Sequence, residues 1–485
     1  MTAADDVLSD ELPLDLSGEP LRTAMRRITG AWMFGSIWQN ALSGAPLTLF
    51  ATHLGATNFE FGVLAAIPFL AALLALPASV LIDRSGRRDR LFFFGLYPNR
   101  LLWIAAAVLP ILVIQRFGSS WKPVAVFVFL SLVFLINCGQ GLGGPAWTHW
   151  MSDIVPPRIR GRYFAKRRQL AIYTGIPASL LAGWVLDRYA DSPPMTVLML
   201  CGGIFCVAAI FGTVDIATFH FIPHTRRRTP RTSLLGSLLH PLTNGRFVLF
   251  CVGSAVLWFA VAGQGQFVNK FLIERLQIHS TAVQLITLVG PMIAQLIMLP
   301  VWGLAIDRFG KKPAMVISIL GLVPVGLGWV LLHRGDIWLG YVLTVAGAAF
   351  WTGVEVANFN LTIELSGTDK TGQGGGSAYV AINTVILNVA GCLGGLFYGT
   401  VAERWQDLHW NSSINAVGNI TYYEALFLIS GVLRLVAVLP VLVMREPEAQ
   451  PTIVALRFIA GNLYSNAVGA ALLPVRLFRA RDVQQ

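Results

Sequence analysis

A carboxylate inside an apolar segment is the side chain best placed to do chemistry in this sequence. Glu355 lies in the apolar segment 337–362, and Trp351, Asn358 and Thr362 lie at offsets that place all four residues on one face of a helix. A carboxylate buried in such a helix binds a cation, carries a proton or pairs with a buried base. We therefore take Glu355 as a candidate ion-coupling residue, with a packing or gate salt bridge as the alternative.

Side-chain amides recur in three other apolar segments of the chain. Amides both donate and accept hydrogen bonds, and indole rings stack on the faces of sugars, so together they suit hydroxyl-rich or uncharged polar compounds. The same groups would also accept a drug-like amphiphile, so the class of compound stays open. These amides belong to Gln39, Asn40, Asn137, Gln140, Gln264 and Gln266.

The elements that must position these residues are apolar helices. The chain has 485 residues, of which 55% are hydrophobic and only 13% charged, and its mean hydropathy is +0.63. A soluble domain of this size needs more charge to cover its surface. The apolar residues form blocks of roughly twenty, the length that crosses a hydrocarbon core as a helix. We therefore predict an all-α polytopic membrane protein.

Twelve apolar blocks set the expected topology, which places both termini on one side of the bilayer. With that topology, 27 Lys and Arg residues fall on the side of the termini and 6 on the other side. Such an excess marks the cytoplasmic side, so the termini are expected in the cytoplasm. The predicted spans are 31–51, 58–82, 91–114, 123–147, 169–188, 195–219, 247–270, 280–306, 313–333, 337–362, 377–400 and 421–444.

The net charge of +11 is explained by this topology, because the basic residues lie in short loops between apolar blocks. No nucleic-acid partner is expected. The five cysteines all fall inside apolar blocks without metal-site spacing to histidine, so we expect no metal and no cofactor. They are Cys138, Cys201, Cys206, Cys251 and Cys392.

Polar and basic stretches divide the chain into five parts. We expect a cytoplasmic tail over 1–30, a six-helix bundle over 31–219, a basic linker over 220–246, a second six-helix bundle over 247–444 and a cytoplasmic tail over 445–485. Apolar spacing within 453–475 predicts a helix that lies on the membrane surface. A thirteenth span is the alternative, but it conflicts with keeping the tail's five basic residues inside.

A few further charges lie in or near the spans. Arg100 and Arg434 are expected to pair with a neighbour or to snorkel to the membrane surface. Asp215 is expected at the cytoplasmic interface and Lys270 at the outer interface.

A short sequence that occurs twice is the most specific signal. Residues 81–88 read LIDRSGRR and residues 305–312 read AIDRFGKK, each directly after an apolar helix. The two aspartates, Asp83 and Asp307, lie close to half the chain length apart, which indicates duplication of a whole helical bundle. The glycine permits a tight turn, and the basic residues hold that turn at the cytoplasmic face.

On these residues the chain resembles the major facilitator superfamily over roughly residues 25–445. The loop signature of that family reads G-x-L-x-D-R-x-G-R-[RK], and the second copy matches it at Gly303 and at Asp307 to Lys312. The first copy carries Ser79 where the leading glycine is usual. By this resemblance the loops act as a cytoplasmic gate whose salt bridges favour the outward-facing state. The gate residues would be Asp83, Arg84, Gly86, Arg87, Asp307, Arg308, Gly310 and Lys311.

The resemblance also implies two pseudo-symmetric six-helix bundles with spans 1, 4, 7 and 10 around a central cavity. All four spans carry amides or Trp, so we expect this cavity to be lined by Gln39, Asn40, Asn137, Gln140, Gln264, Gln266, Trp351, Glu355 and Asn358. The fourth span departs from the R-x-x-Q-G pattern of many proton-coupled members, because Asn137 stands in place of the arginine. The fifth span lacks the pattern of drug/proton antiporters, which argues against an antiporter.

Four functions are compatible with these residues. The first is an ion-coupled transporter of a small organic solute, with a proton or cation coupled at Glu355, and the second is a facilitator of the same fold in which Glu355 is structural. A polytopic membrane enzyme would usually carry acidic or His residues on an interfacial loop. The longest outer loop does carry Glu403, Asp407 and His409, but the repeat gives no reason for catalysis there, so an enzyme is disfavoured. A transporter-like receptor would have the same sequence features. The short loops suggest the bacterial inner membrane.

Overall fold

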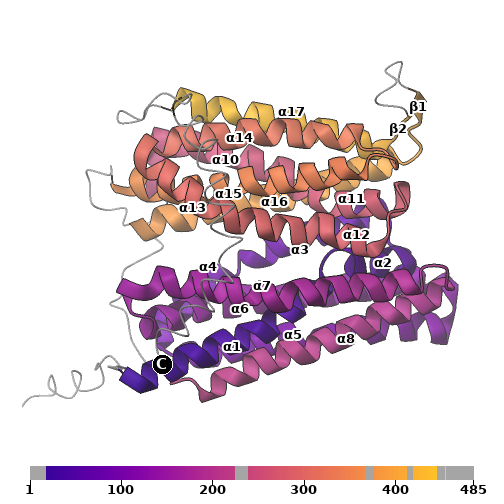
Figure 1. The fold of residues 1–485 in the computed structure, drawn as a ribbon, viewed down its shortest axis with the longest axis horizontal. Helices are drawn as coiled ribbons and strands as arrows, with labels where there is room; N and C mark the ends of the chain where they lie inside the picture. Colours follow the sequence, from indigo (N-terminus) through magenta and orange to yellow (C-terminus); the bar gives the residue numbers. More distant parts are fainter. Residues whose placement is uncertain (1–17, 224–238, 368–375, 412–418, 445–453, 455–485) are drawn as a thin grey trace, which may run out of the picture. The chain divides into compact units, whose positions relative to one another are not determined.

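The computed structural model describes residues 18–223, 239–367, 376–411, 419–444 and Val454, and within these the chain is almost entirely helical (Figure 1). The one extended feature is a two-residue antiparallel pair formed by β1 (Trp410–Asn411) and β2 (Asn419–Ile420). Eleven helices of the described part are long and apolar enough to cross a membrane. The predicted all-α polytopic fold is thus confirmed. The predicted tail helix over 453–475 and most of the basic linker lie outside the described residues.

The chain forms two compact units. The described helices of the first unit are α1 (Gly18–Leu42), α2 (Ala45–Leu54), α3 (Asn58–Ala72), α4 (Ala75–Ser85), α5 (Arg88–Phe117), α6 (Lys122–Ile154), α7 (Pro157–Arg188), α8 (Pro194–Thr218) and α12 (Ser280–Gln284). Those of the second are α10 (Gly245–Ala262), α11 (Gln264–Lys270), α13 (Gly290–Phe309), α14 (Lys311–Gly328), α15 (Ile337–Gly367), α16 (Gly376–Arg404) and α17 (Tyr422–Val443).

The first predicted span is a broken helix. The sequence predicts one helix over 31–51, but α1 ends at Leu42 and α2 begins at Ala45. Gly44 has a φ of 74°, a left-handed conformation that glycine adopts readily, and Pro46 sits in the first turn of α2 where it needs no hydrogen-bonded N–H. The pair of short helices explains why this predicted span is not one of the eleven.

The fifth predicted span begins about three helical turns before its expected start. A loop was predicted up to residue 168, yet α7 begins at Pro157. The six basic residues of this stretch therefore lie on a helix. The sequence predicted a loop here because so many residues are charged. Long straight-chain residues such as Arg and Lys are good helix formers, and Pro157 suits a helix start.

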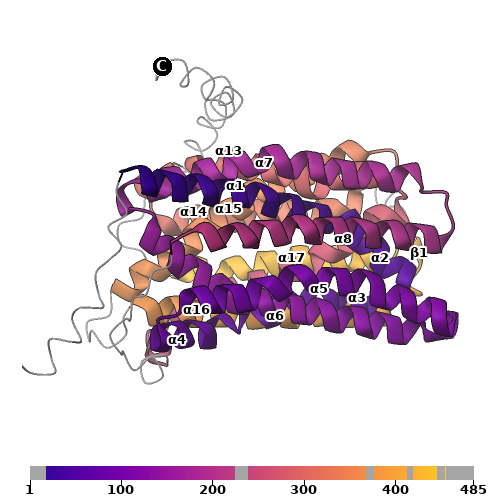
Figure 2. The same cartoon turned by 90° about the horizontal axis from the view of Figure 1, so that it is seen from below.

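Aromatic packing and close glycine contacts hold the first unit together. Phe92 contacts Trp150 and Phe219, with ring centroids 5.3 and 4.7 Å apart. Helices α5 and α6 lie side by side in both views (Figures 1 and 2). A Cβ added to Gly95 would lie 2.6 Å from the backbone of Gly139 and Gly143. Small residues at such a contact let two helix backbones approach closely in a membrane.

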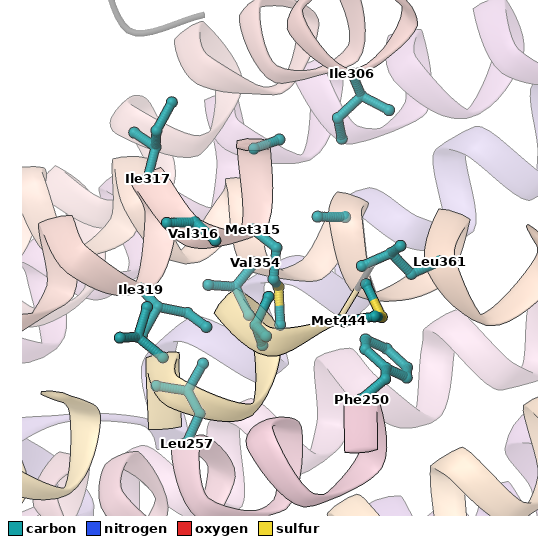
Figure 3. Packing of buried hydrophobic residues seen from close by; sticks show 14 of the residues in the cluster. Phe250, Leu257, Ile306, Met315, Val316, Ile317, Ile319, Val354, Leu361 and Met444 are labelled. Atoms are coloured by element: carbon teal, nitrogen blue, oxygen red, sulfur yellow. The ribbon is translucent and has the colours of Figure 1, made fainter. Parts of the chain in front are cut away.

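The core of the second unit is built mainly from aliphatic and aromatic side chains of six helices, some of which Figure 3 shows. Phe250 and Leu257 enter it from α10, Met315 from α14 and Leu361 from α15. Trp302 of α13 is fully buried there and donates its Nε1–H to the Ala349 carbonyl at 2.8 Å. The bond satisfies the indole inside an apolar core, as a buried polar group requires.

We expect Gly95→Ala to destabilise the protein, because the new methyl group would force α5 and α6 apart. Overpacking of this kind costs about 1–3 kcal/mol. Thermal unfolding of the purified protein in detergent measures the effect. Gly203→Ala is the matched control, since a Cβ at Gly203 of α8 meets no atom within 4 Å. Equal unfolding temperatures for the two variants would contradict the packing argument.

Candidate functional site

Glu355 lies beside a pair of tryptophans in the second unit. Its side chain is exposed, and its Oε1 accepts a hydrogen bond from Trp351 Nε1 at 3.0 Å, one helical turn earlier on α15. The Trp351 ring packs on the half-buried Trp258 of α10, with centroids 4.8 Å apart and planes tilted by 51°. The carboxylate and two indoles form one surface that offers both a hydrogen-bond acceptor and aromatic faces.

The polar stripe on α15 divides into an open part and a closed part. Asn358 and Thr362 are buried, unlike Glu355. Asn383 of α16 donates to Asn358 Oδ1 at 2.8 Å and to Thr362 Oγ1 at 3.1 Å, and Asn358 donates to Ser254 Oγ of α10 at 3.1 Å. These three helices are therefore joined by a buried polar network whose members satisfy one another.

Gln264, another predicted cavity residue, supports a buried arginine. Arg434 of α17 donates to Gln264 Oε1 and to the Leu322 carbonyl of α14, the latter at 2.7 Å. Ser430 donates to the same Gln264 oxygen at 3.1 Å. The expectation that Arg434 pairs with a neighbour holds, although its described hydrogen-bond partners are neutral oxygens.

The remaining predicted cavity residues are four residues of the first unit and Gln266 of α11. Gln39 and Gln140 are exposed, and Gln266 is half-buried. Asn40 is buried and donates to the Ser36 carbonyl at 2.8 Å, while Asn137 donates to the Val133 carbonyl at 2.8 Å. Each of these two amides thus bonds to its own helix, one turn earlier. Their role as a cavity lining stays a prediction.

A buried ion pair links α5 to α8 in the first unit. Asp215 was expected at the interface, but it is only 3% exposed, and Arg100 Nη2 lies 3.4 Å from its Oδ2. The Arg100 guanidinium also stacks on Trp38 of α1, 3.5 Å from the ring centroid. Burial of Asp215 is possible because Gly35 of α1 leaves room for its carboxylate. Lys270, which was expected to reach the outer interface, is also buried, at 6% exposure.

Asp215→Asn should destabilise the protein by about 3–5 kcal/mol, because it leaves Arg100 buried without its counter-charge. Thermal unfolding in detergent checks this, with the exposed Asp191→Asn as control. Removing both charges in Arg100→Met/Asp215→Leu should recover most of the loss. A single variant as stable as wild type would rule out the ion pair as a structural element.

The two copies of the repeated sequence each place a glycine with positive φ directly after a helix. Gly86 and Gly310, which follow α4 and α13, have φ values of 62° and 100°, as the predicted tight turns require. In the first unit Arg88 pairs with Asp153 near the end of α6. In the second, Lys311 Nζ lies 2.7 Å from Glu364 Oε2 near the end of α15. Both turns are therefore tied by an ion pair to the end of another helix of the same unit.

The other predicted gate residues take no part in these two ion pairs. Arg87, Asp307 and Arg308 are exposed. The side chains of Asp83 and Arg84 lie outside the described residues. The gate function of this set stays a prediction.

The segment Leu272–Gln284 belongs to the first unit although it follows α10 and α11 of the second. Asp187 at the end of α7 accepts the backbone N–H groups of Ser280 and Thr281, at 2.5 and 2.9 Å, and so caps the helix that begins at Ser280. The fully buried Gln284 donates to Ser43 O at 3.1 Å and accepts from Ala45 N at 3.3 Å. Its amide thereby satisfies backbone groups at the break between α1 and α2.

This segment is bounded by irregular helix on both sides. Phe271–Arg275 and Leu285–Val289 are π-helical. The chain passes from the second unit to the first after Phe271, and back to the second unit at Leu285. Such wide turns are frequent at functional positions in helices.

Asp187→Ala should release the start of this helix. We expect hydrogen exchange at the Ser280 and Thr281 amides to accelerate on the order of ten-fold or more, because each loses a charge-assisted hydrogen bond. Mass spectrometry of peptides covering 272–284 measures it. Asp191→Ala, three residues beyond α7, removes an exposed carboxylate and should leave the exchange unchanged.

Sequence reasoning did not find several of the buried polar contacts. Asp187 and Gln284 act on backbone groups far away in the chain, so no local pattern marks them. Arg100 and Asp215 did carry a signal, since each is a charge inside an apolar block.

A model of the Major Facilitator Superfamily matches residues 28–395. A curated protein of Arabidopsis thaliana, D-xylose-proton symporter-like 1, is 23% identical over 150 residues, which are 31% of this chain and 26% of that protein. The match thus spans about a quarter of the relative's length.

Solved structures resemble the fold over most of the chain. A mutant of the nucleoside transporter NupG superposes with a TM-score of 0.61 at 15% identity, covering 86% of this chain and 100% of that one. A D-xylose-proton symporter gives 0.59 at 16% identity, covering 89% and 98%. At these identities the likeness shows the fold alone.

Proposed function

Because the chain belongs to the major facilitator superfamily, and is therefore an integral membrane transporter of small solutes and not an enzyme, we propose that it is an ion-coupled carrier. In this proposal a small organic solute crosses the bilayer by alternating access, and a proton or cation is coupled at Glu355. The carboxylate beside Trp351 is the observation that carries it.

The exposure of Glu355 supports a coupling role. The other acidic side chains discussed above, Asp153, Asp215 and Glu364, are each held in an ion pair with a basic residue of a neighbouring helix. Glu355 accepts a hydrogen bond from the neutral indole N–H of Trp351, and its side chain is exposed, so a proton or cation can reach it. A carboxylate within a span is costly unless it serves such a role or finds a partner.

The solute class proposed is a hydroxyl-rich compound. Trp258 and Trp351 provide apolar ring faces next to a hydrogen-bond acceptor, the combination that sugar rings and ribose need. Similar proteins include a D-xylose-proton symporter and a nucleoside transporter by their names, which is consistent with this class. A facilitator of the same fold remains the second candidate, since the Trp351 bond would equally suit a structural Glu355.

The proposal also retains the expected gate, domains and location. The two turns after α4 and α13 would close the cytoplasmic side, with the predicted gate residues Asp83, Arg84, Gly86, Arg87, Asp307, Arg308, Gly310 and Lys311. The excess of basic residues supports cytoplasmic termini, and the short loops support the bacterial inner membrane. Large exposed apolar side chains, such as Phe94, Phe127 and Val443, suit contact with lipid.

Glu355→Gln should abolish ion-driven accumulation while leaving equilibration of the solute intact. Removal of the titrating oxygen uncouples the gradient but keeps the size and most hydrogen bonds of the side chain. The measurement is uptake of a library of solutes into proteoliposomes, with and without an imposed pH gradient.

Asp336→Asn is the matched control, because this exposed carboxylate lies just before α15. It should accumulate solute as the wild type does. If wild type and Glu355→Gln both merely equilibrate the solute, the facilitator is the correct assignment and Glu355 is structural.

A further inference from the structure

Arg167 of α7 is a buried arginine held between two tryptophans. Its guanidinium carbon lies 4.5 Å from the ring centroid of Trp32 on α1 and 4.9 Å from that of Trp147 on α6. The residue is only 9% exposed. The sequence placed it in a basic loop, but α7 begins ten residues earlier and carries it into the helical unit.

The polar atoms of Arg167 are not used within the described part of the chain. Nε is fully enclosed and has no hydrogen-bond partner there, and no described carboxylate forms an ion pair with the guanidinium. Its two contacts with defined geometry are the faces of the indole rings. The terminal nitrogens are not among the enclosed polar atoms, so they retain access to a small molecule.

The buried carboxylate that interacts electrostatically with Arg167 is already engaged. Asp215 interacts electrostatically with both Arg167 and Arg100, but its ion pair and hydrogen bond are with Arg100. Two guanidinium groups therefore share one buried carboxylate. A buried cation without a full counter-charge is unfavourable, and the indole faces offset only part of that cost.

The position of Arg167 relates it to the transport path of the proposed function. Trp32 and Trp147 belong to the first and fourth spans, which would line that path in a carrier of this superfamily. A guanidinium held flat between two rings keeps its fork of N–H donors in one orientation, and this fork matches the two oxygens of a carboxylate or phosphate.

Resting on the proposed function, we propose that Arg167 binds an anionic oxygen group of the transported solute. The anionic group of the solute then supplies the negative charge that neutralises Arg167. The two tryptophans keep the guanidinium in the orientation that binds this group. The solute class becomes a hydroxyl-rich acid or phosphate ester rather than a neutral sugar.

The test uses the full chain in detergent and isothermal titration calorimetry with three matched probes. D-glucuronate carries a carboxylate, D-glucose 6-phosphate carries a phosphate, and D-glucose carries neither. We expect saturable binding of at least one anionic probe and at least ten-fold weaker binding of D-glucose. The probe that binds more tightly shows whether the natural solute carries a carboxylate or a phosphate.

Variants assign the binding to Arg167. Arg167→Gln should lower the affinity for the anionic probe on the order of 10- to 100-fold, as expected for loss of a charged hydrogen-bond donor. Arg167→Lys keeps the positive charge but lacks the planar fork of N–H donors, so its affinity should lie between those of wild type and Arg167→Gln. Lys166→Gln removes the same charge from the exposed neighbouring position and should bind as wild type does.

Two results would overturn the inference: no anionic probe binds to the folded wild-type protein, or Arg167→Gln binds the anion as tightly as Lys166→Gln. Thermal unfolding of each variant shows that it is folded. Transport of neutral solutes by Arg167→Gln at the wild-type rate, without anion binding by the wild type, would leave the proposed function standing while this inference fails.

Discussion

The absence of water from the hydrocarbon core is the constraint on which this structure depends, because polar groups buried in the spans must find partners inside the protein. The break between α1 and α2 is possible because Gln284 satisfies the freed groups of Ser43 and Ala45. Arg434 is held by Gln264 and a backbone carbonyl, and Arg100 by Asp215. Each of these contacts joins helices that apolar packing alone would leave free to slide.

The same constraint distinguishes residues that support the fold from residues that could act on a solute. Asn358 and Thr362 lie on the same helix face as Glu355, but their side chains form hydrogen bonds within a buried network of three helices. Glu355 and Arg167 differ from them, since the first is exposed beside an indole and the second has unused donors between two indoles. A carrier needs polar groups of this second kind, because its solute must replace water at each step.

Apolar block length predicted eleven of the twelve spans well, since a continuous hydrophobic helix is a local property of the sequence. Helix ends were less predictable. The basic start of α7 was predicted as a loop, although Arg and Lys favour helix. The break at Gly44-Ala45-Pro46 was missed because these residues lie within a continuous apolar segment. The repeated turns at Gly86 and Gly310 were predictable because glycine marks positive φ. Pairings such as Asp187 with Ser280 or Arg100 with Asp215 depend on residues far apart in the chain, so one sequence does not reveal them.

The central claim is that this chain is a carrier that exposes one solute site alternately to each side of the bilayer. Counterflow in proteoliposomes tests it most directly, because this exchange requires an alternating site whether or not an ion is coupled. Vesicles preloaded with an unlabelled solute from the sugar, nucleoside, sugar-acid and sugar-phosphate classes are diluted into the labelled compound. If the site alternates, label accumulates transiently above its equilibrium level for at least one class of solute. Simple equilibration, or no uptake of any class by the folded protein, would contradict it.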